Sequence, residues 1–332
     1  MANEIYPVSW WGSPVENGWG GIYYNYAQGG GLDGTSFITT WRTTTSNETI
    51  TIPTTGSGYN YDISTSDGQT FTSITGSQAI TFATAGDYDV SISGDFPRIS
   101  IANGVDKDKI INIKQWGNIV WSSFQSSFFG CSNLVGTFTD APNLTNVTDM
   151  SNSFRNCPSF FANLSSWDVS NVRSFSAAFM IFGGGATAPS TPVSGLYSWD
   201  MSNATSISAI LRGQTNYNED LSSWNVSNVT NMSNTFFGST SFDQNLSAWD
   251  IANVTSFTNF SRNITFSTSN YDAILIGWEA TLQAAFPNGT GYTPSISINF
   301  GNSEYTGGAA AAAARTSLIN NFNWTITDGG IA

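Results

Sequence analysis

The side chains that could carry out chemistry in this chain are few. The sequence contains no histidine, which excludes an imidazole base, a histidine-dependent catalytic triad and a histidine-ligated metal. It has no Gly-x-x-x-x-Gly-Lys-Ser/Thr loop that could hold a phosphate. A pair of carboxylates for glycoside hydrolysis stays open among the 23 acidic residues. We therefore expect a protein that is not an enzyme and uses no cofactor, with a polysaccharide-degrading enzyme as a minor alternative.

Three carboxylates recur at one position of a repeated motif: Asp168, Asp200 and Asp250, with Asn225 at the equivalent place. If the repeats stack as neighbouring strands do, these side chains lie about 5 Å apart. Like charges at that spacing repel each other, and a row of oxygen ligands could hold Ca²⁺. The alternative, favoured because each repeat supplies only one carboxylate, is that each side chain is solvated or caps a backbone turn.

The two cysteines, Cys131 and Cys157, lie three positions after the equivalent phenylalanines Phe128 and Phe154. Stacked repeats would place them side by side, about 5 Å apart, which is within the Cα separation of a disulfide. We expect adjacent cysteines that are bonded if the protein matures in an oxidising compartment and reduced otherwise.

The elements that position these side chains are repeats of about 25 residues. Blocks that begin Leu-x-x-Trp place tryptophans at positions 167, 199, 224 and 249. The alternating Leu-x-x-Trp-x-Val is typical of a short strand, and apolar pairs four residues apart, such as Met150 and Phe154, are typical of a helical turn. A fixed period of this kind predicts a solenoid, and solenoids present extended binding surfaces. Residues 183–195 lengthen one repeat and predict a loop suited to recognition.

An asparagine recurs between the two apolar groups of every repeat. The positions are Asn146, Asn171, Asn203, Asn228 and Asn253. In a stacked coil, a buried asparagine can satisfy backbone groups of its own repeat and of the next one. We expect a structural ladder.

The unit Asn-Val-Thr-x-Met-Ser-x-x-Phe, followed by Phe-x-Gln-x-Leu-Ser-x-Trp-Asp-Val-Ser, resembles the BspA-type leucine-rich-repeat surface proteins of bacteria. The resemblance covers roughly residues 112–266 and is closest at residues 228–249. It implies a leucine-rich-repeat solenoid used for adhesion and surface display, without catalytic residues. Segments similar to residues 51–61 and 85–94 often precede such repeats. This chain departs from the family most at its N-terminus.

Four segments follow from these patterns, in a mainly β protein with short helices. Residues 1–35 are rich in aromatic residues and glycine. Residues 36–104 alternate with period two and predict an immunoglobulin-like or PKD-like β-sandwich. Residues 105–268 form the leucine-rich-repeat solenoid. Residues 269–332, with helical patterns at 271–286 and 309–322, predict an α/β unit that caps the last repeat and buries Trp278 and Trp324.

The first segment is too short for a core of its own, so its aromatic residues predict attachment to a partner. They are Trp10, Trp11, Trp19, Tyr23 and Tyr24. The alternative is that they pack on the neighbouring sandwich. Residues 1–12 lack the basic and apolar regions of a signal peptide. This favours a bacteriophage virion surface protein (a fibre, spike or decoration protein bound to other virion proteins) over an extracellular or bacterial cell-surface adhesin. A homo-oligomer stays open.

The charge and the polar residues indicate what such a surface binds. A formal net charge of −13 argues against nucleic acid and anionic membranes, and no apolar run is long enough for a membrane span. Serine, threonine and asparagine side chains near Tyr197, Tyr217 and Phe242 suit a sugar, which is held by hydrogen bonds and by stacking on aromatic rings. We expect non-catalytic binding of a host-surface polysaccharide or protein. The alternative for Tyr217 and Phe242 is a place in the core.

Overall fold

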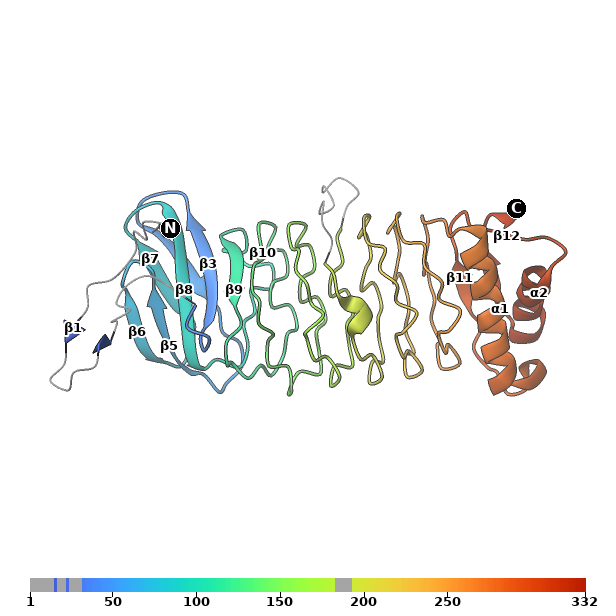
Figure 1. Ribbon diagram of the computed structural model, residues 1–332, viewed down its shortest axis with the longest axis horizontal. Coiled ribbons are helices and arrows are strands. Elements are labelled where there is room, and N and C mark those ends of the chain that lie inside the picture. Colours follow the sequence, from blue (N-terminus) through green and yellow to red (C-terminus); the bar gives the residue numbers. More distant parts are fainter. Residues whose placement is uncertain (1–14, 17–21, 24–31, 183–192) are drawn as a thin grey trace, which may run out of the picture.

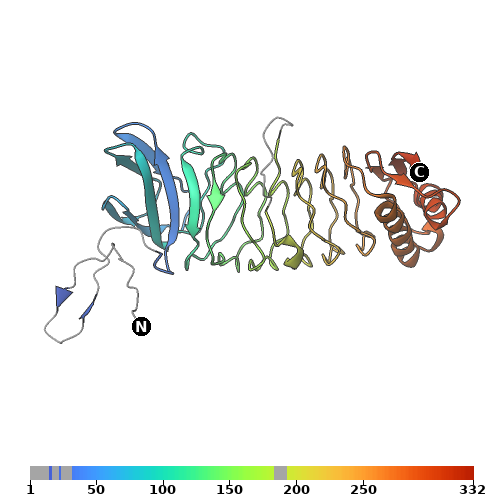
Figure 2. The ribbon, with the colours of Figure 1, turned by 45° about the horizontal axis from the view of Figure 1, so that its top comes forward.

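The computed structural model describes residues 15–16, 22–23, 32–182 and 193–332, and the structural statements below concern those residues. They form an elongated molecule in which a β-sheet, a row of stacked coils and a helical unit follow one another in chain order (Figure 1). The view turned by 45° shows the coils as loops of similar size, side by side (Figure 2). The described residues are thus mainly β and irregular structure, with both of their α-helices at one end.

The N-terminal part is built on a six-stranded sheet in the order β10-β9-β3-β8-β5-β6. Its strands are β3 (Phe37–Thr43), β5 (Asn60–Thr65), β6 (Thr70–Ile74), β8 (Gly86–Asp95), β9 (Ile110–Gln115) and β10 (Val135–Gly136). A second, antiparallel pair consists of β4 (Glu48–Ile52) and β7 (Gln78–Phe82). Along β5, Tyr61, Ile63 and Thr65 are buried, because successive side chains of a strand point to opposite faces. A short pair, β1 (Val15–Glu16) and β2 (Ile22–Tyr23), comes before this sheet in the chain.

The predicted immunoglobulin-like or PKD-like β-sandwich is wrong. Such a sandwich packs two sheets of several strands each, whereas here one sheet has six strands and its companion only two. The large sheet also takes in β9 and β10, which belong to the first repeats: β9 pairs antiparallel with β3, and β10 pairs parallel with β9. Period-two alternation identified the strands but could not show how they are grouped into sheets.

Each repeat forms one coil, and hydrogen bonds join each coil to the next. The N–H groups of Met150, Phe175 and Met232 donate to carbonyls one coil further on. Single parallel bridges run down the same side of the coils: Asp149 with Ser174, Ser174 with Ser206, Ser206 with Asn231 and Asn231 with Ser256. Most of the backbone between these bridges is turn or irregular.

The predicted leucine-rich-repeat solenoid is also wrong, because such repeats contribute a strand and a helical element each. Among the described residues of the coils after β9, the regular elements are β10 and the 3-10 helix η1 (Leu196–Ser198) alone. The Leu-x-x-Trp motif is a turn, closed by the Trp167 N–H donating to the Leu164 carbonyl at 3.1 Å. The apolar pairs four residues apart flank a residue with positive φ, such as Asn152, and one left-handed residue interrupts both a strand and a helix.

The interior of the coils is apolar and largely aromatic. The tryptophans at 167, 199, 224 and 249 are at most 3% exposed. Equivalent rings of successive coils stack: Trp224 on Trp249 at 6.1 Å between centroids, and Phe154 on Phe179 at 5.7 Å. Offset stacking of this kind adds about 1 kcal/mol per pair beyond the burial of apolar area.

The C-terminal unit places two helices and two small sheets on the last coil. Its elements are α1 (Thr268–Ala285), the 3-10 helix η2 (Pro287–Gly289), β11 (Ser297–Asn299), β12 (Glu304–Tyr305), α2 (Ala310–Phe322), β13 (Thr325–Thr327) and β14 (Gly330–Ile331). β11 pairs with β13 and β12 with β14, both in parallel. Trp278 and Trp324 are buried, as predicted. No described helix is long and apolar enough to cross a membrane.

Candidate functional site

The recurring asparagines form a ladder of hydrogen bonds. The side-chain amides of Asn171, Asn203, Asn228 and Asn253 donate to the carbonyls of Thr145, Ser170, Ser202 and Ser227, at 2.7 to 3.1 Å. Each acceptor lies in the preceding coil, directly before that coil's own ladder asparagine. The predicted ladder is therefore confirmed at these four positions. The prediction that these asparagines are buried is wrong, since they and Asn146 are exposed.

A second ladder runs through the interior and was not predicted. The indole N–H groups of Trp199, Trp224 and Trp249 donate to the carbonyls of Leu164, Leu196 and Leu221, at 2.7 to 3.0 Å. Trp278 of α1 continues it by donating to Leu246 at 2.9 Å. The helix therefore supplies the side chain that a further coil would supply. The regular spacing of the tryptophans was the signal that could have revealed this ladder.

The recurring aspartates cap turns of their own coils. The carboxylates of Asp168, Asp200 and Asp250 accept the N–H two residues further along, at 2.9 to 3.1 Å. Hydrogen bonds from Ser170 lower the pKa of Asp168. Within the described residues, no three histidine, cysteine, aspartate or glutamate side chains gather to hold a metal ion. The structure thus gives these aspartates the turn-capping role that stood as the alternative to calcium.

Two of the three aromatic residues predicted to bind sugar lie in the core. Tyr217 and Phe242 are both 0% exposed, and their rings stack at 6.4 Å between centroids. The Tyr217 hydroxyl donates to Glu219 at 3.1 Å. A buried ring cannot stack on a ligand, so neither residue is available for binding. Tyr197, in contrast, is 54% exposed.

Tyr197 lies in η1, where residues 183–195 rejoin the coils, and its backbone is firmly held. The Glu219 carboxylate accepts the N–H groups of Gly195 and Leu196, at 2.8 and 3.1 Å. The Ser223 hydroxyl donates to the Tyr197 carbonyl at 2.9 Å. Of the inserted loop itself, residues 183–192 lie outside the described residues.

The attachment residues predicted at the N-terminus are not tested. Trp10, Trp11, Trp19 and Tyr24 lie outside the described residues, and Tyr23 lies in β2 without a described side chain. The two predicted cysteines are free and buried. The Cys157 thiol donates to the Phe128 carbonyl at 2.9 Å. Burial, together with a hydrogen bond to Cys157, raises the pKa of Cys131, so the thiols are neighbours without a disulfide in this structure.

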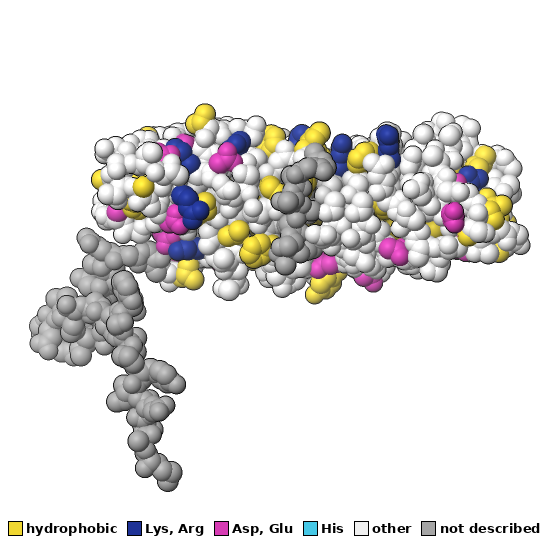
Figure 3. Space-filling model, turned by 90° about the horizontal axis from the view of Figure 1, so that it is seen from above, with side chains coloured by type: hydrophobic (Ala, Val, Ile, Leu, Met, Phe, Trp, Pro, Cys, Tyr) yellow, Lys and Arg dark blue, Asp and Glu magenta, His cyan; other side chains and the backbone are white. Residues whose placement is uncertain are grey.

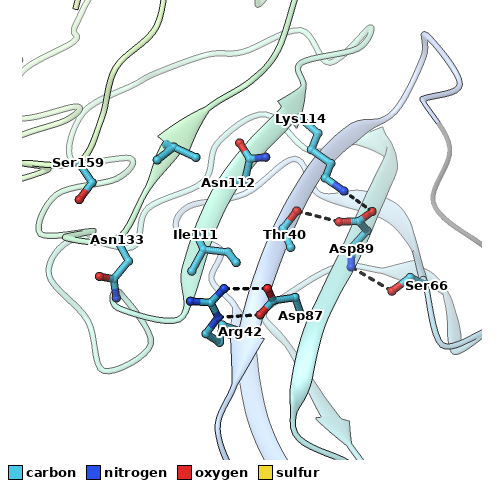
Figure 4. A pocket seen from close by; sticks show the side chains of 11 residues that line it. Thr40, Arg42, Ser66, Asp87, Asp89, Ile111, Asn112, Lys114, Asn133 and Ser159 are labelled. Atoms are coloured by element: carbon cyan, nitrogen blue, oxygen red, sulfur yellow. Dashed lines mark hydrogen bonds and ion pairs between the residues drawn. The ribbon is translucent and has the colours of Figure 1, made fainter. Parts of the chain in front are cut away.

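A hollow of about 850 Å³ opens on the face of the large sheet, over β3, β8 and β9 (Figure 4). Its charges neutralise one another: Arg42 pairs with Asp87, and Lys114 with Asp89, both at 2.7 Å. The Arg42 guanidinium lowers the pKa of Asp87. A general acid for glycoside hydrolysis needs a raised pKa instead, so the paired carboxylate Asp87 is unsuited to that role.

The coils are the part of the chain that resembles known sequences. Residues 122–188 and 181–280 match a family described as "Mycoplasma protein of unknown function, DUF285". No curated protein and no solved structure matches the chain significantly. The two matched stretches cover the coils from residue 122 onwards and most of α1. The match is compatible with the resemblance to BspA-type surface proteins, and the likeness lies in the repeats.

Proposed function

We propose that the coils form a non-enzymatic recognition surface that binds a polysaccharide on a host cell. The observation that carries the proposal is the exposed ring of Tyr197 on a hydrogen-bonded support. Sugars bind proteins through stacking on aromatic rings and through hydrogen bonds to hydroxyl and amide groups. Ser165, Ser198 and Ser223 lie at or beside this turn and are joined to it by hydrogen bonds.

The support of Tyr197 suits recognition because it is ordered before any ligand arrives. The Leu196 carbonyl accepts the indole N–H of Trp224 at 2.7 Å, and the Ser198 hydroxyl donates to the Gly195 carbonyl at 2.8 Å. A site that is already ordered loses little conformational entropy on binding. Each site would bind weakly, and many copies on one particle would strengthen attachment through avidity.

The setting in which the surface is displayed stays a proposal from the sequence. A bacteriophage virion, with residues 1–35 bound to other virion proteins, is the first candidate. A bacterial cell-surface adhesin is the alternative. Neighbouring genes distinguish them: capsid, portal or tail genes support the virion, and secretion or sorting genes support the adhesin.

Binding of the isolated chain to glycans tests the proposed function. We expect chains coupled to beads to bind a subset of glycans on an array and to adsorb to host cells. Tyr197→Ala should weaken this binding about tenfold, the loss expected when a stacked ring and its contact area are removed. Phe161→Ala is the matched control, because Phe161 is another exposed aromatic residue of the coils, 43% exposed.

Three outcomes would contradict the proposal. Beads that bind neither glycans nor cells would remove the recognition role. Equal loss of binding in the Tyr197→Ala and Phe161→Ala variants would show that Tyr197 is not a specific contact of the glycan. Release of sugar fragments from a bound polysaccharide would show an enzyme.

A further inference from the structure

Six side chains from six successive coils alternate between phenylalanine and arginine along one edge of the molecule. In order they are Phe129, Arg155, Phe182, Arg212, Phe237 and Arg262, here called the Arg–Phe row. Each guanidinium carbon lies 4.6 to 5.7 Å from the centroid of a neighbouring ring in the row. Figure 3 shows basic and hydrophobic side chains alternating along this edge of the coils.

The row arises from one register of the repeat. Five of its members follow a residue with positive φ by three positions; these left-handed residues are Ser126, Asn152, Ala209, Asn234 and Asn259. In the third coil the same register holds Met180, which is buried, and Phe182 takes the place in the row instead. Phe182 is 51% exposed. The stack therefore continues without a gap across six coils.

The three arginines of the row have no carboxylate partner within the described residues. The ion pairs found there use Arg42, Lys107, Lys109, Lys114 and Arg315. Arg155 donates to the Asn152 side-chain oxygen at 3.0 Å, and its Nε atom is buried without a partner among the described residues. In a chain with a net charge of −13, the row concentrates unneutralised positive charge along one edge.

The stacking also prepares the arginines for a ligand. Arg212 lies between Phe182 and Phe237, with centroids at 5.0 and 4.6 Å from its Cζ atom. A guanidinium whose charge lies over aromatic rings uses no hydrogen bond to reach them, so its free N–H groups can bind a planar acceptor such as a carboxylate through two parallel hydrogen bonds. Successive guanidinium groups lie about 10 Å apart, because one coil lies between them and each step from coil to coil is about 5 Å.

We propose that the Arg–Phe row binds an acidic polysaccharide that carries a carboxylate on every second sugar. Such a chain presents its carboxylates at a period comparable to the spacing of the arginines, so that one polymer can contact all three. This inference rests on the proposed function and names its ligand class. Nucleic acid fits less well, because it carries a phosphate at every nucleotide and is therefore repelled by the acidic remainder of the chain more strongly than a polymer with one charge on every second sugar.

The test measures binding of the full chain to hyaluronate, in which every second sugar carries a carboxylate. The matched ligand is hyaluronate whose carboxylates have been reduced to alcohols; polygalacturonate and single-stranded DNA of similar length complete the set. The variant is Arg155→Gln/Arg212→Gln/Arg262→Gln. Arg173→Gln is the matched control, because Arg173 is an exposed arginine of the coils outside the row. Circular dichroism and thermal unfolding verify that each variant folds.

We expect the chain to bind hyaluronate and not its reduced form, with affinity that falls as salt rises. Each Arg→Gln change should weaken binding about tenfold, and Arg173→Gln should leave it unchanged. Arg212→Lys keeps the charge but loses the planar guanidinium, so its affinity should lie between that of Arg212→Gln and that of the unchanged chain. If the triple variant unfolds, the single variants and Arg212→Lys provide the same comparison.

The proposal is overturned if hyaluronate does not bind, if reduced hyaluronate binds equally well, or if polygalacturonate or DNA binds more tightly than hyaluronate. It is also overturned if the control variant loses as much affinity as the variants of the row. Binding of neutral glycans that depends on Tyr197 but not on the row would leave the proposed function standing without this inference. Absence of all glycan binding would remove both.

Discussion

The interior tryptophan ladder allows one hydrogen bond to be measured against a matched position that lacks it. The Trp249 indole N–H donates to the Leu221 carbonyl at 2.9 Å. The Trp167 indole N–H is buried and has no partner among the described residues. Both rings are buried in the stack, at 0% and 3% exposure. Replacing each tryptophan by phenylalanine removes the same atoms from similar surroundings, but only Trp249→Phe breaks a hydrogen bond.

The difference between the two variants can be worked out from these contacts. Replacing the indole by the smaller phenyl ring destabilises both variants to a similar extent, so this contribution cancels in the comparison. Trp249→Phe loses a net hydrogen bond of about 1 kcal/mol, because the Leu221 carbonyl keeps a second donor, the Trp224 N–H at 3.1 Å. Trp167→Phe removes an unpaired buried donor, which offsets its loss by about 1 kcal/mol. Trp249→Phe should therefore be the less stable variant by about 2 kcal/mol.

Urea unfolding followed by circular dichroism measures this difference. Arrays of repeats can unfold in steps, so the comparison holds only where both variants keep the m-value of the parent chain. Equal losses of stability, or a larger loss in Trp167→Phe, would refute the assignment of the hydrogen bonds. Trp224→Phe should resemble Trp249→Phe, because its N–H donates to the Leu196 carbonyl at 2.7 Å.

Three further predictions concern single positions. Ala209 has a φ of 53°, so Ala209→Gly should stabilise the chain by about 0.5 to 1 kcal/mol in urea unfolding, whereas Ala178→Gly, where φ is not positive, should destabilise it. Hydrogen bonds from the Thr44 N–H and from Lys109 lower the pKa of Glu48 from 4.5 to about 2. The ionised side chain therefore stabilises the fold above pH 4.5, and this stabilisation is lost as the pH falls towards 2. In the Glu48→Gln variant, Tm should fall less steeply between pH 4.5 and 2. Because burial raises the pKa of Cys131, native protein at mildly alkaline pH should resist iodoacetamide and unfolded protein should react; rapid labelling of the native thiol would contradict the structure.

The sequence was sufficient for features that repeat in register. The asparagine ladder followed from one recurring residue, and the burial of Trp278 and Trp324 followed from the need to cover the last coil. The two helices of the C-terminal unit were expected at 271–286 and 309–322 and occur at nearly the same residues. In each case one physical requirement, a partner for a backbone group or a cover for an apolar surface, points to one arrangement.

The sequence was not sufficient where two local structures share one pattern. Leu-x-x-Trp-x-Val alternates like a strand, yet the Trp167 N–H returns to the Leu164 carbonyl and closes a turn. Tyr217 and Phe242 stood near the predicted loops, yet both complete the aromatic stack of the interior. Hydropathy shows that such a residue is apolar, and only the packing of the coils shows whether its ring faces inwards.

The Arg–Phe row was missed for a different reason, since its signal lies in the comparison of repeats rather than in any one of them. Phe129 and Phe237 occupy the register of Arg155, Arg212 and Arg262, and an alignment of the repeats on their apolar pairs would have shown the alternation. Phe182, however, lies two residues beyond that register, so no alignment would have placed it. The row is continuous because Phe182, two residues beyond the buried Met180, supplies a ring that both flanking arginines contact. Phe182→Ala should therefore break the row into two halves. It should lower the affinity for hyaluronate more than Phe161→Ala does, even though all three arginines remain.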